Sequence, residues 1–244
     1  MYYDYLIKIW PYEHILSVGS QSFRAMSFHG MHADNPDSLG QVGKLADDLK
    51  HDWLQFEELM VGCVFSLVFE KLKPAINEHL RRYDLDCHDQ LMLEKDDFEI
   101  IQDELVTRRN KHILAPHIDN LRGALTILYY MPPDSDHMHL GTLFYKQVGP
   151  GRPLLPKDMP VPFYAQYASS SSITCVEAKR VPFAPNTLIA FVNSIDAWHG
   201  QHLDEMYDRR GYQSFFGVRE ALLDRIFDAQ SVRALTCGGA ADAT

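Results

Sequence analysis

The sequence predicts a mainly β domain of the α+β class, a jelly roll with supporting helices before it and one helix after it. Three observations predict this fold. Helical periodicity dominates the first third of the chain, short β-type runs follow it, and Pro or Gly residues separate those runs. The chain has 244 residues, of which 46% are hydrophobic. That length and apolar content suit one domain with a substantial core.

The helical part comes first. Between Leu39 and Arg82, apolar residues recur at the spacing of one helix face. The stripe consists of Leu39, Val42, Leu45, Leu49, Trp53, Phe56 and Met60. A second helical stretch is expected to be interrupted at Pro74, with a short third piece after it. We therefore expect residues 1–90 to form a helical support region that packs on the core.

Seven β-type runs follow the helical part. They are Phe98–Leu105, His112–Asp119, Ala124–Met131, Thr142–Lys146, Ile173–Arg180, Leu188–Asn193 and Gly211–Val218. After them, Ala221–Leu235 has the pattern of one closing helix. We expect residues 91–236 to form the β core with this helix, and 237–244 to be a disordered tail, within one structural domain overall. The long connection Gln147–Ser172 contains five prolines and four consecutive serines, which is typical of a functional or mobile loop.

Composition limits the partners and the compartment. A net charge of −10 argues against nucleic acid or an anionic membrane surface as the main partner. The start of the chain lacks the apolar region of a signal peptide, and no apolar run is long enough to span a membrane. Four scattered cysteines indicate a reducing compartment, so we expect a cytoplasmic protein. Twelve histidines indicate that imidazole and carboxylate would be the ligands of any bound metal.

The strongest candidate for chemistry is the segment HILAPHIDN. His117 and Asp119 are two residues apart in a predicted strand, so both side chains leave the same face. A later apolar run, FVNSIDAWHG, ends with His199. Two histidines and one carboxylate form the facial triad that binds non-haem Fe(II) and leaves coordination positions open. The alternative is a solvated strand end, because paired His and Asp residues are common on surfaces.

The last β-type run, RGYQSFFGV, begins with a candidate cation, Arg210. Alternation places Arg210, Tyr212 and Ser214 on one strand face. A buried guanidinium with nearby hydroxyls suits the distal carboxylate of a dicarboxylic acid, because Arg forms bidentate, charge-assisted hydrogen bonds. The run LTILYYMPP adds Tyr130 as a candidate donor. Taken singly, Arg210 suits an ion pair with Asp208 and Tyr130 suits the core.

Taken together, these motifs resemble a known enzyme family. HIDN, LTILYYMPP, GTLFY, FVNSIDAWHG and RGYQSFFGV closely resemble the 2-oxoglutarate/Fe(II)-dependent dioxygenases, particularly their prolyl-4-hydroxylase-like branch, over roughly residues 111–218. The resemblance implies a double-stranded β-helix, which is a variant of the jelly roll. It also implies that His117, Asp119 and His199 bind the iron.

The resemblance further implies a site for the cosubstrate. Tyr130 and Arg210 would bind the C5 carboxylate of 2-oxoglutarate, and Ser214 would assist. Arg209 is the alternative to Arg210, because a shift of one residue in register exchanges the two faces of a strand. The segment HLGTLF (His139–Phe144) departs from the glycine-rich hairpin of many relatives, which affects hairpin geometry and removes no ligand.

The implied reaction uses Fe(II), 2-oxoglutarate and O₂, with ascorbate as a candidate reductant. It hydroxylates an unactivated C–H bond of a small molecule, a natural-product or glycan-pathway metabolite, and releases succinate and CO₂. The carboxylate of Asp119 favours hydroxylation or desaturation over halogenation. The alternatives are a hydroxylase of protein side chains, a catalytically silent jelly-roll binding module, and a cupin-like metal enzyme that does not use 2-oxoglutarate. The oligomeric state stays open.

Other polar residues have secondary expectations. Lys157, Tyr164, Tyr167, Asp204 and Tyr207 are expected to flank the mouth of the site. A second histidine-rich group is expected to lie in a solvated loop and at a strand end rather than at a metal, and it consists of His137, His139 and His202. The acidic segment EKDDFEIIQDE is expected to solvate one face of a strand or helix, because it lacks the spacing of a Ca²⁺ loop.

Overall fold

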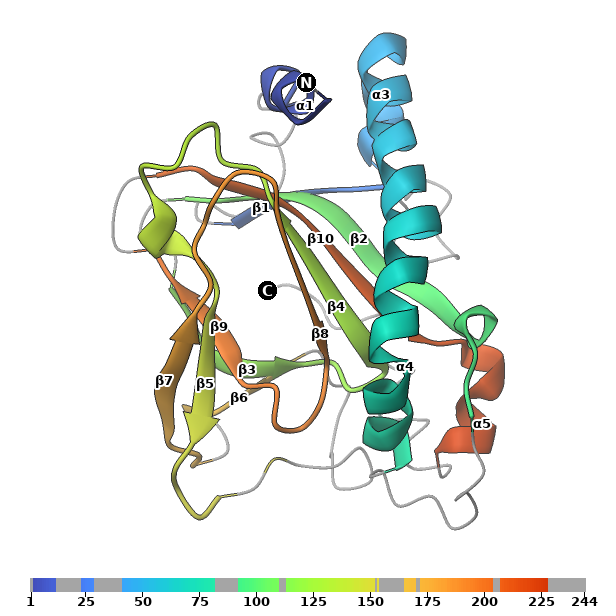
Figure 1. Ribbon diagram of the computed structural model, residues 1–244, viewed down its shortest axis with the longest axis vertical. Helices are drawn as coiled ribbons and strands as arrows, with labels where there is room; N and C mark the ends of the chain where they lie inside the picture. The colour runs from blue at the N-terminus through green and yellow to red at the C-terminus, as the bar shows by residue number, and fades with distance from the viewer. Residues whose placement is uncertain are drawn as a thin grey trace.

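Two antiparallel sheets face each other and form a barrel (Figure 1). The computed structural model describes residues 2–11, 23–28, 41–81, 92–109, 113–151, 153, 165–169, 172–203 and 207–227. The predicted tail at 237–244 and most of the long 147–172 connection lie outside these residues. The division into residues 1–90 and 91–236 stays a prediction.

Each sheet has five strands. The first has the order β1 (Phe23–Ser27), β2 (Phe98–Arg108), β10 (Arg209–Val218), β4 (Gly123–Tyr130) and β8 (Thr187–Val192). The second has the order β6 (Ala165–Tyr167), β3 (Ile113–Asp119), β9 (His199–His202), β5 (Leu143–Gln147) and β7 (Cys175–Arg180). From β2 to β5 and again from β7 to β10, the chain alternates between the sheets. This is the winding of a double-stranded β-helix, and it confirms the predicted fold class.

All seven predicted β-type runs are strands, with shifted ends. The sequence patterns did not indicate three further strands, β1, β6 and β9. Two of these, β6 and β9, have three and four residues, which is too short for a clear alternation of polar and apolar positions. The last strand begins at Arg209, two residues before the predicted start at Gly211.

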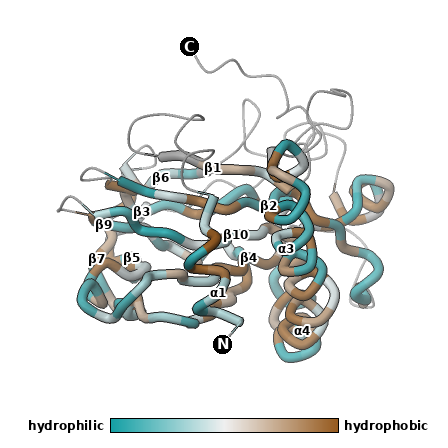
Figure 2. The backbone as a smooth tube through the Cα atoms, turned by 90° about the horizontal axis from the view of Figure 1, so that it is seen from above, coloured by the Kyte–Doolittle hydropathy of each residue, from teal (hydrophilic) through white to brown (hydrophobic). Residues whose placement is uncertain are grey.

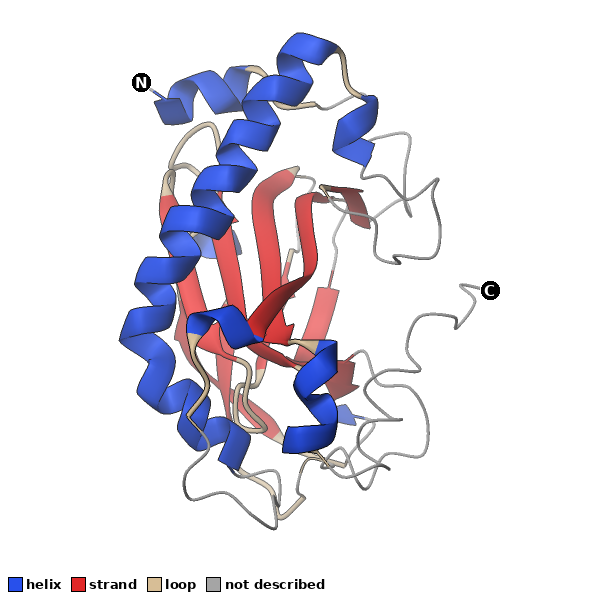
Figure 3. Ribbon diagram, turned by 90° about the vertical axis from the view of Figure 1, so that its right-hand side faces the viewer, coloured by secondary structure: helices blue, strands red, loops and turns tan. Residues whose placement is uncertain are grey.

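The helices lie mainly outside the first sheet. They are α1 (Tyr2–Lys8), η2 (Gln41–Lys44), α3 (Asp47–Glu58), the π-helical turn η3 (Leu59–Val64), α4 (Phe65–Arg81), η4 (Lys95–Asp97), η5 (Met138–Leu140), η8 (Glu220–Leu222) and α5 (Leu223–Ile226). The segments α3, η3 and α4 form one continuous rod beside the first sheet (Figure 3). Viewed from above, this rod stands on the opposite side of the barrel from β5 and β7 (Figure 2).

The predicted apolar stripe holds this rod against the sheet. Within the described residues, Trp53 and Phe56 are buried. The ring of Phe56 packs edge-on against that of Tyr212 on β10, with ring centroids 5.3 Å apart. At the start of α4, Phe65 stacks on Phe216 with ring centroids 3.8 Å apart. Burial of these aromatic rings accounts for the attachment of an amphipathic helix to a sheet face.

Two predicted helix boundaries were wrong. Helix α4 continues through Pro74, which is exposed. The carbonyl of Glu70, which loses its usual partner there, belongs to an exposed residue and can be hydrated. The closing helix predicted at Ala221–Leu235 ends at Ile226, because Phe227 has extended backbone angles (φ −122°, ψ 149°). Residues 228–235 lie outside the described part of the chain.

No helix within the described residues is long and apolar enough to cross a membrane. Of the four cysteines, Cys63 and Cys175 are described, and both are free thiols.

Candidate metal centre and anion pocket

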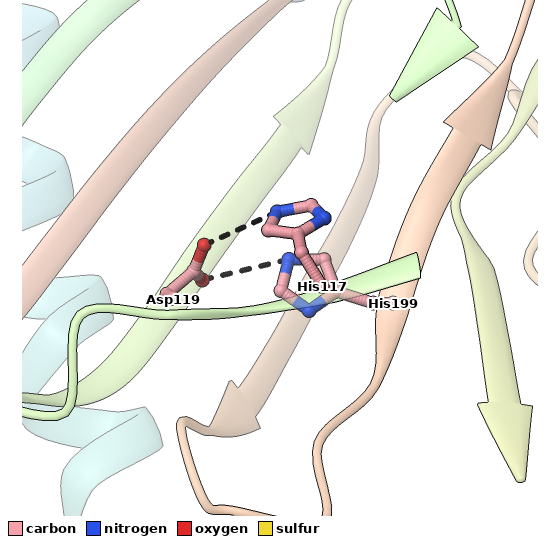
Figure 4. A group of neighbouring side chains, drawn as sticks. All are labelled: His117, Asp119 and His199. Carbon is pink, nitrogen blue, oxygen red and sulfur yellow. Dashed lines mark ion pairs between the residues drawn. The ribbon is translucent and has the colours of Figure 1, made fainter. Parts of the chain in front are cut away.

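The three predicted metal ligands lie together between the two sheets. His117 on β3 is the direct register partner of His199 on β9, and their rings are 4.3 Å apart. Nε2 of each histidine lies 3.5 Å from a different carboxylate oxygen of Asp119 (Figure 4). All three ligand atoms fall within 4.8 Å of one another. The chain thus brings together two residues that are 82 positions apart in the sequence (117 and 199).

The backbone around the histidines explains this closeness. A register shift between Leu114 and His117 marks a bulge in β3, and bulges re-aim side chains next to functional sites. Opposite the bulge, a Cβ on Gly200 would lie only 2.5 Å from the Leu114 carbonyl oxygen. Position 200 therefore requires glycine for β9 to approach β3. A side chain there would push the two histidines apart.

Local backbone carbonyls orient both imidazoles. Nδ1 of His117 lies 2.9 Å from the Ala115 carbonyl oxygen, and Nδ1 of His199 lies 2.9 Å from that of Ala197. A carbonyl oxygen can only accept, so Nδ1 carries the proton in each ring. The lone pair of each Nε2 then faces Asp119. This is the tautomer that a metal-binding histidine needs.

The charges of the triad suit a cation. Burial by itself would raise the pKa of Asp119, but the neighbouring imidazoles of His199 and His117 and the hydrogen bond from Thr126 lower that pKa to about 2. Burial lowers the pKa of His199 to about 4, and the attraction of Asp119 offsets this only in part. At neutral pH the site contains an ionised carboxylate and a neutral His199. Both are in the form that binds a metal.

The donor set fits non-haem iron better than the other common metals. Two imidazoles and one carboxylate on one side of a cavity form the facial triad of Fe(II) oxygenases. Within the described residues, no other group of His, Cys, Asp or Glu side chains is arranged to hold a metal. The second histidine-rich group takes no part. His137 packs against the ring of Tyr207 with ring centroids 3.9 Å apart, and His202 is exposed.

The triad opens into a cavity whose walls carry two arginines. Arg209 on β10 and Arg108 on β2 both line it, together with Thr142, Gln213 and the apolar side chains of Leu114, Leu128 and Phe215. Both arginines are buried in a chain whose net charge is −10. A cavity with this lining favours anionic ligands.

Arg209 lies in a ring of hydrogen bonds at the start of β5. Its Nε donates to the Leu140 carbonyl oxygen at 2.9 Å, and one Nη lies 3.3 Å from Oγ1 of Thr142. The Tyr130 hydroxyl also lies 2.6 Å from Thr142 Oγ1 and accepts from the Thr142 N–H at 2.6 Å. The Arg209 guanidinium lies 4.8 Å from the centre of the Tyr130 ring. Tyr130 thus stands behind Thr142 and beside Arg209.

The structure places two of the predicted cosubstrate ligands away from the cavity. Arg210 and Ser214 share a face of β10 with Tyr212, and that face is turned toward the helical rod. The large aromatic residues on this face pack against α3 and α4. The alternative residue, Arg209, is the one that lines the cavity.

Sequence patterns missed Arg108 and its neighbours. The strand β2 continues three residues beyond the predicted end at Leu105, and Arg108 is its last residue. Asp103 and Glu104, expected to be solvated, are buried instead. Alternation along a longer strand would have placed Glu104 and Arg108 on one face. Burial raises the pKa of Glu104, although hydrogen bonds from Gln102 and Gln213 oppose the shift.

The predicted mouth residues divide into three groups. Tyr167 lies beside the triad, with its ring 5.5 Å from that of His117, and it is partly exposed. Tyr207 packs against the ring of His137 instead. Lys157, Tyr164 and Asp204 lie outside the described residues.

No family model matches the chain, and no curated protein matches its sequence. Among solved structures, it is similar to the non-haem α-ketoglutarate-dependent epimerase SnoN from nogalamycin biosynthesis (11% identity, 89% of this chain and 71% of that chain, TM-score 0.44). It is also similar to the auxin dioxygenase AtDAO1 of Arabidopsis thaliana with 2-oxoglutarate (15%, 89% and 76%, 0.41). A third similar structure is HygX of Streptomyces hygroscopicus with nickel and 2-oxoglutarate (12%, 88% and 79%, 0.39). At these identities and TM-scores the likenesses assign no function, so the chain's own residues must do so.

Proposed function

We propose that the protein is a non-haem Fe(II)- and 2-oxoglutarate-dependent oxygenase that hydroxylates a small molecule. One observation carries the proposal. A triad of His117, Asp119 and His199 shares a cavity with the buried guanidinium of Arg209. A metal site with one carboxylate and a nearby cation is the combination that an anionic, metal-chelating cosubstrate needs.

The triad residues would hold the iron. Bound Fe(II) and 2-oxoglutarate, with O₂, supply the oxidising chemistry that turns a C–H bond into an alcohol and releases succinate and CO₂. The protein contributes prepared ligands, since the carbonyls of Ala115 and Ala197 fix the tautomers of the two histidines. Thr126 donates to Asp119 at 3.0 Å and holds the carboxylate in place.

Arg209 would bind the distal carboxylate of 2-oxoglutarate, in place of the Arg210 expected from the sequence. A buried cation is costly unless it is paired, and a carboxylate is its best partner. Thr142 would donate to the same carboxylate, and Tyr130 would fix the orientation of the Thr142 hydroxyl. Gly141 keeps Thr142 at this depth, because a Cβ on Gly141 would collide with the Val181 carbonyl.

The apolar walls and the mouth of the cavity are the parts that would contact the substrate. Leu114, Leu128 and Phe215 keep water away from the metal side of the cavity. Tyr167, partly exposed beside His117, offers a ring against which a small organic substrate can stack. A natural-product or glycan-pathway metabolite fits this opening. Ascorbate as reductant and the prolyl-4-hydroxylase-like branch belong to the same proposal.

An anaerobic titration tests the proposal. Fe(II) and 2-oxoglutarate added together should give the metal-to-ligand charge-transfer absorption of the chelate. His117→Ala should abolish the band. The control is His202→Ala, which changes an exposed histidine on β9 and should keep the band. Iron that binds without this band would contradict the proposal and favour a cupin-like metal site.

Exposure to air provides the second part of the test. Succinate should appear after O₂ is admitted, at a rate that rises when the true substrate is added from a compound library. An intact band without any succinate would indicate a silent binding module.

A further inference from the structure

We propose that Arg108, positioned by Gln213, forms a second carboxylate-binding subsite in the cavity, separate from that of Arg209. The subsite rests on the proposed function and extends it. Its ligand is either the carboxylate next to the keto group of the cosubstrate or a carboxylate of the substrate. Both sources offer the same chemistry to a guanidinium, and the experiment below separates them.

The two arginines are direct neighbours across two strands. Arg108 ends β2, Arg209 begins β10, and the two residues are register partners. Both side chains are buried and line the cavity. Like charges directly opposite each other in a sheet are destabilising. An anionic group bound at each guanidinium would offset this repulsion.

The two guanidiniums reach in different directions. That of Arg209 contacts Leu140 and Thr142, near the start of β5. That of Arg108 runs back along the sheet, where one Nη donates to Oε1 of Gln213 at 2.9 Å. Gln213 lies four residues further along β10 than Arg209. The two guanidiniums therefore face different parts of the cavity, one beside Thr142 and the other beside Gln213.

The part of the cavity that the Arg108 guanidinium reaches is close to the proposed metal centre. Gln213 pairs with Leu128 on β4, and two residues before Leu128 is Thr126, whose hydroxyl donates to Asp119 at 3.0 Å. The electrostatics agree with this placement. Burial and the charge of Arg209 lower the pKa of Arg108 to about 9, and the charges of Glu104 and Asp119 partly oppose the shift.

A row of hydrogen bonds positions Arg108. The side-chain amide of Gln213 donates to Oε2 of Glu104 at 2.9 Å, while its oxygen accepts from Arg108. Glu104 thereby fixes the amide with its oxygen toward the guanidinium. A guanidinium held in one orientation is prepared for bidentate binding of a planar carboxylate.

The first arm of the test compares two keto acids under anaerobic conditions with Fe(II). 2-Oxoglutarate has both carboxylates, whereas 2-oxobutyrate has only the one beside the keto group. If Arg108 binds that carboxylate, Arg108→Met should weaken both ligands at least tenfold. Arg209→Met should weaken 2-oxoglutarate alone. Arg109→Met is the matched control, because the next arginine along the chain is ion-paired with Asp208 at 2.5 Å and does not line the cavity.

The second arm uses protein loaded with Zn²⁺ and saturated with 2-oxoglutarate. Trifluoroacetate, observed by ¹⁹F NMR line broadening, is the probe for a carboxylate of the substrate. If the substrate is the source, trifluoroacetate should bind to the unaltered protein and to Arg109→Met. Its binding should be lost in Arg108→Met, whose affinity for 2-oxoglutarate stays within twofold.

The subsite is refuted if folded Arg108→Met changes neither the keto-acid affinities nor trifluoroacetate binding by more than twofold. If Arg108→Met does not fold, Gln213→Leu replaces it, since this variant keeps the cation and removes its anchor. The same losses, smaller in size, are then expected, and their absence refutes the subsite. If the unaltered protein binds neither keto acid, the proposed function is contradicted instead. Trifluoroacetate binding to the Zn²⁺-loaded protein without 2-oxoglutarate, if it depends on Arg108, would then still support the subsite.

Discussion

The two faces of strand β10 contact different parts of the molecule. One face carries Arg209, Gln213 and Phe215 into the cavity beside the candidate metal centre. The other carries Tyr212 and Phe216 into aromatic contacts with the helical rod. The polar face is suited to ligands, and the aromatic face attaches the helices. A single strand thus separates binding from stability by the alternation of its side chains.

Adjacent residues in this strand are therefore not interchangeable. Arg209 and Arg210 are neighbours in the chain, yet only Arg209 lines the cavity. Both faces of the strand are largely buried, so burial does not distinguish them. What distinguishes them is the partner: a cavity on one side and apolar rings on the other. The comparison can be tested by substitutions on each face.

The largest effect is expected on the helix-facing side. Phe216→Ala removes a fully buried ring that stacks on Phe65 at 3.8 Å. We expect the free energy of unfolding to fall by about 3–5 kcal/mol in urea titrations. Phe215→Ala, on the cavity side and only partly buried, should cost clearly less. Equal losses at the two positions would break the proposed division between the faces.

The next largest effect is expected for binding. Arg209→Met should weaken 2-oxoglutarate binding about 100-fold, roughly 2.7 kcal/mol, because a buried charge-assisted pair is lost. The measurement is the anaerobic titration of the charge-transfer band. Arg210→Met on the opposite face should leave the affinity within twofold. A reversal of these two results would show that the strand presents its other face to the cosubstrate.

Sequence reasoning predicted the three residues that the structure brings together, but it did not show which of two adjacent arginines lines the cavity. A histidine and an aspartate two residues apart on a strand share a face in any sheet, so their spacing alone was informative. Choosing between Arg209 and Arg210 needs knowledge of which face is interior. The first sheet has a cavity on one side and helices on the other, so period-two patterning is uninformative there.

Features that depend on contacts between distant parts of the chain were harder to predict from the sequence. The pairing of His117 with His199 depends on a β9 strand too short to recognise from sequence. Arg108 was missed because polar residues near the end of β2 suggested an earlier stop. The helix that continues through Pro74 does so because the disturbed backbone faces solvent, which is a property of tertiary placement.

A moderate effect is expected from pH, and it should arise on the cavity side. The pKa of His199 falls from its ordinary 6.5 to about 4 in the folded protein, mainly through burial. Between these values the unfolded chain binds a proton that the folded chain does not. The metal-free protein should therefore lose stability as pH falls from 6.5 to 4, by up to about 1.4 kcal/mol per pH unit.

Urea titrations of chelator-treated protein at pH 7, 5.5 and 4.5 measure this slope. His199→Asn should flatten it, and His202→Asn should not. A slope that survives in His199→Asn would assign the acid sensitivity to other groups.

The smallest effect is expected at Ser214. This buried residue faces the helical side, away from the cavity. Ser214→Ala should leave 2-oxoglutarate affinity within twofold and change the free energy of unfolding by about 1 kcal/mol or less. Calorimetric titration of the cosubstrate checks the first expectation. A tenfold loss of affinity would restore Ser214 to the cosubstrate site.

The position of the candidate metal centre has a mechanical consequence for the barrel. His117 and His199 belong to neighbouring strands of the second sheet, and Thr126 ties the carboxylate of Asp119 to the first sheet. A cation held by these three ligands would cross-link β3 to β9 and brace one sheet against the other. Opening of the barrel would then require release of the ion. Metal loading should slow amide hydrogen exchange in β3, β4 and β9 together, so that the three strands open as one cooperative unit.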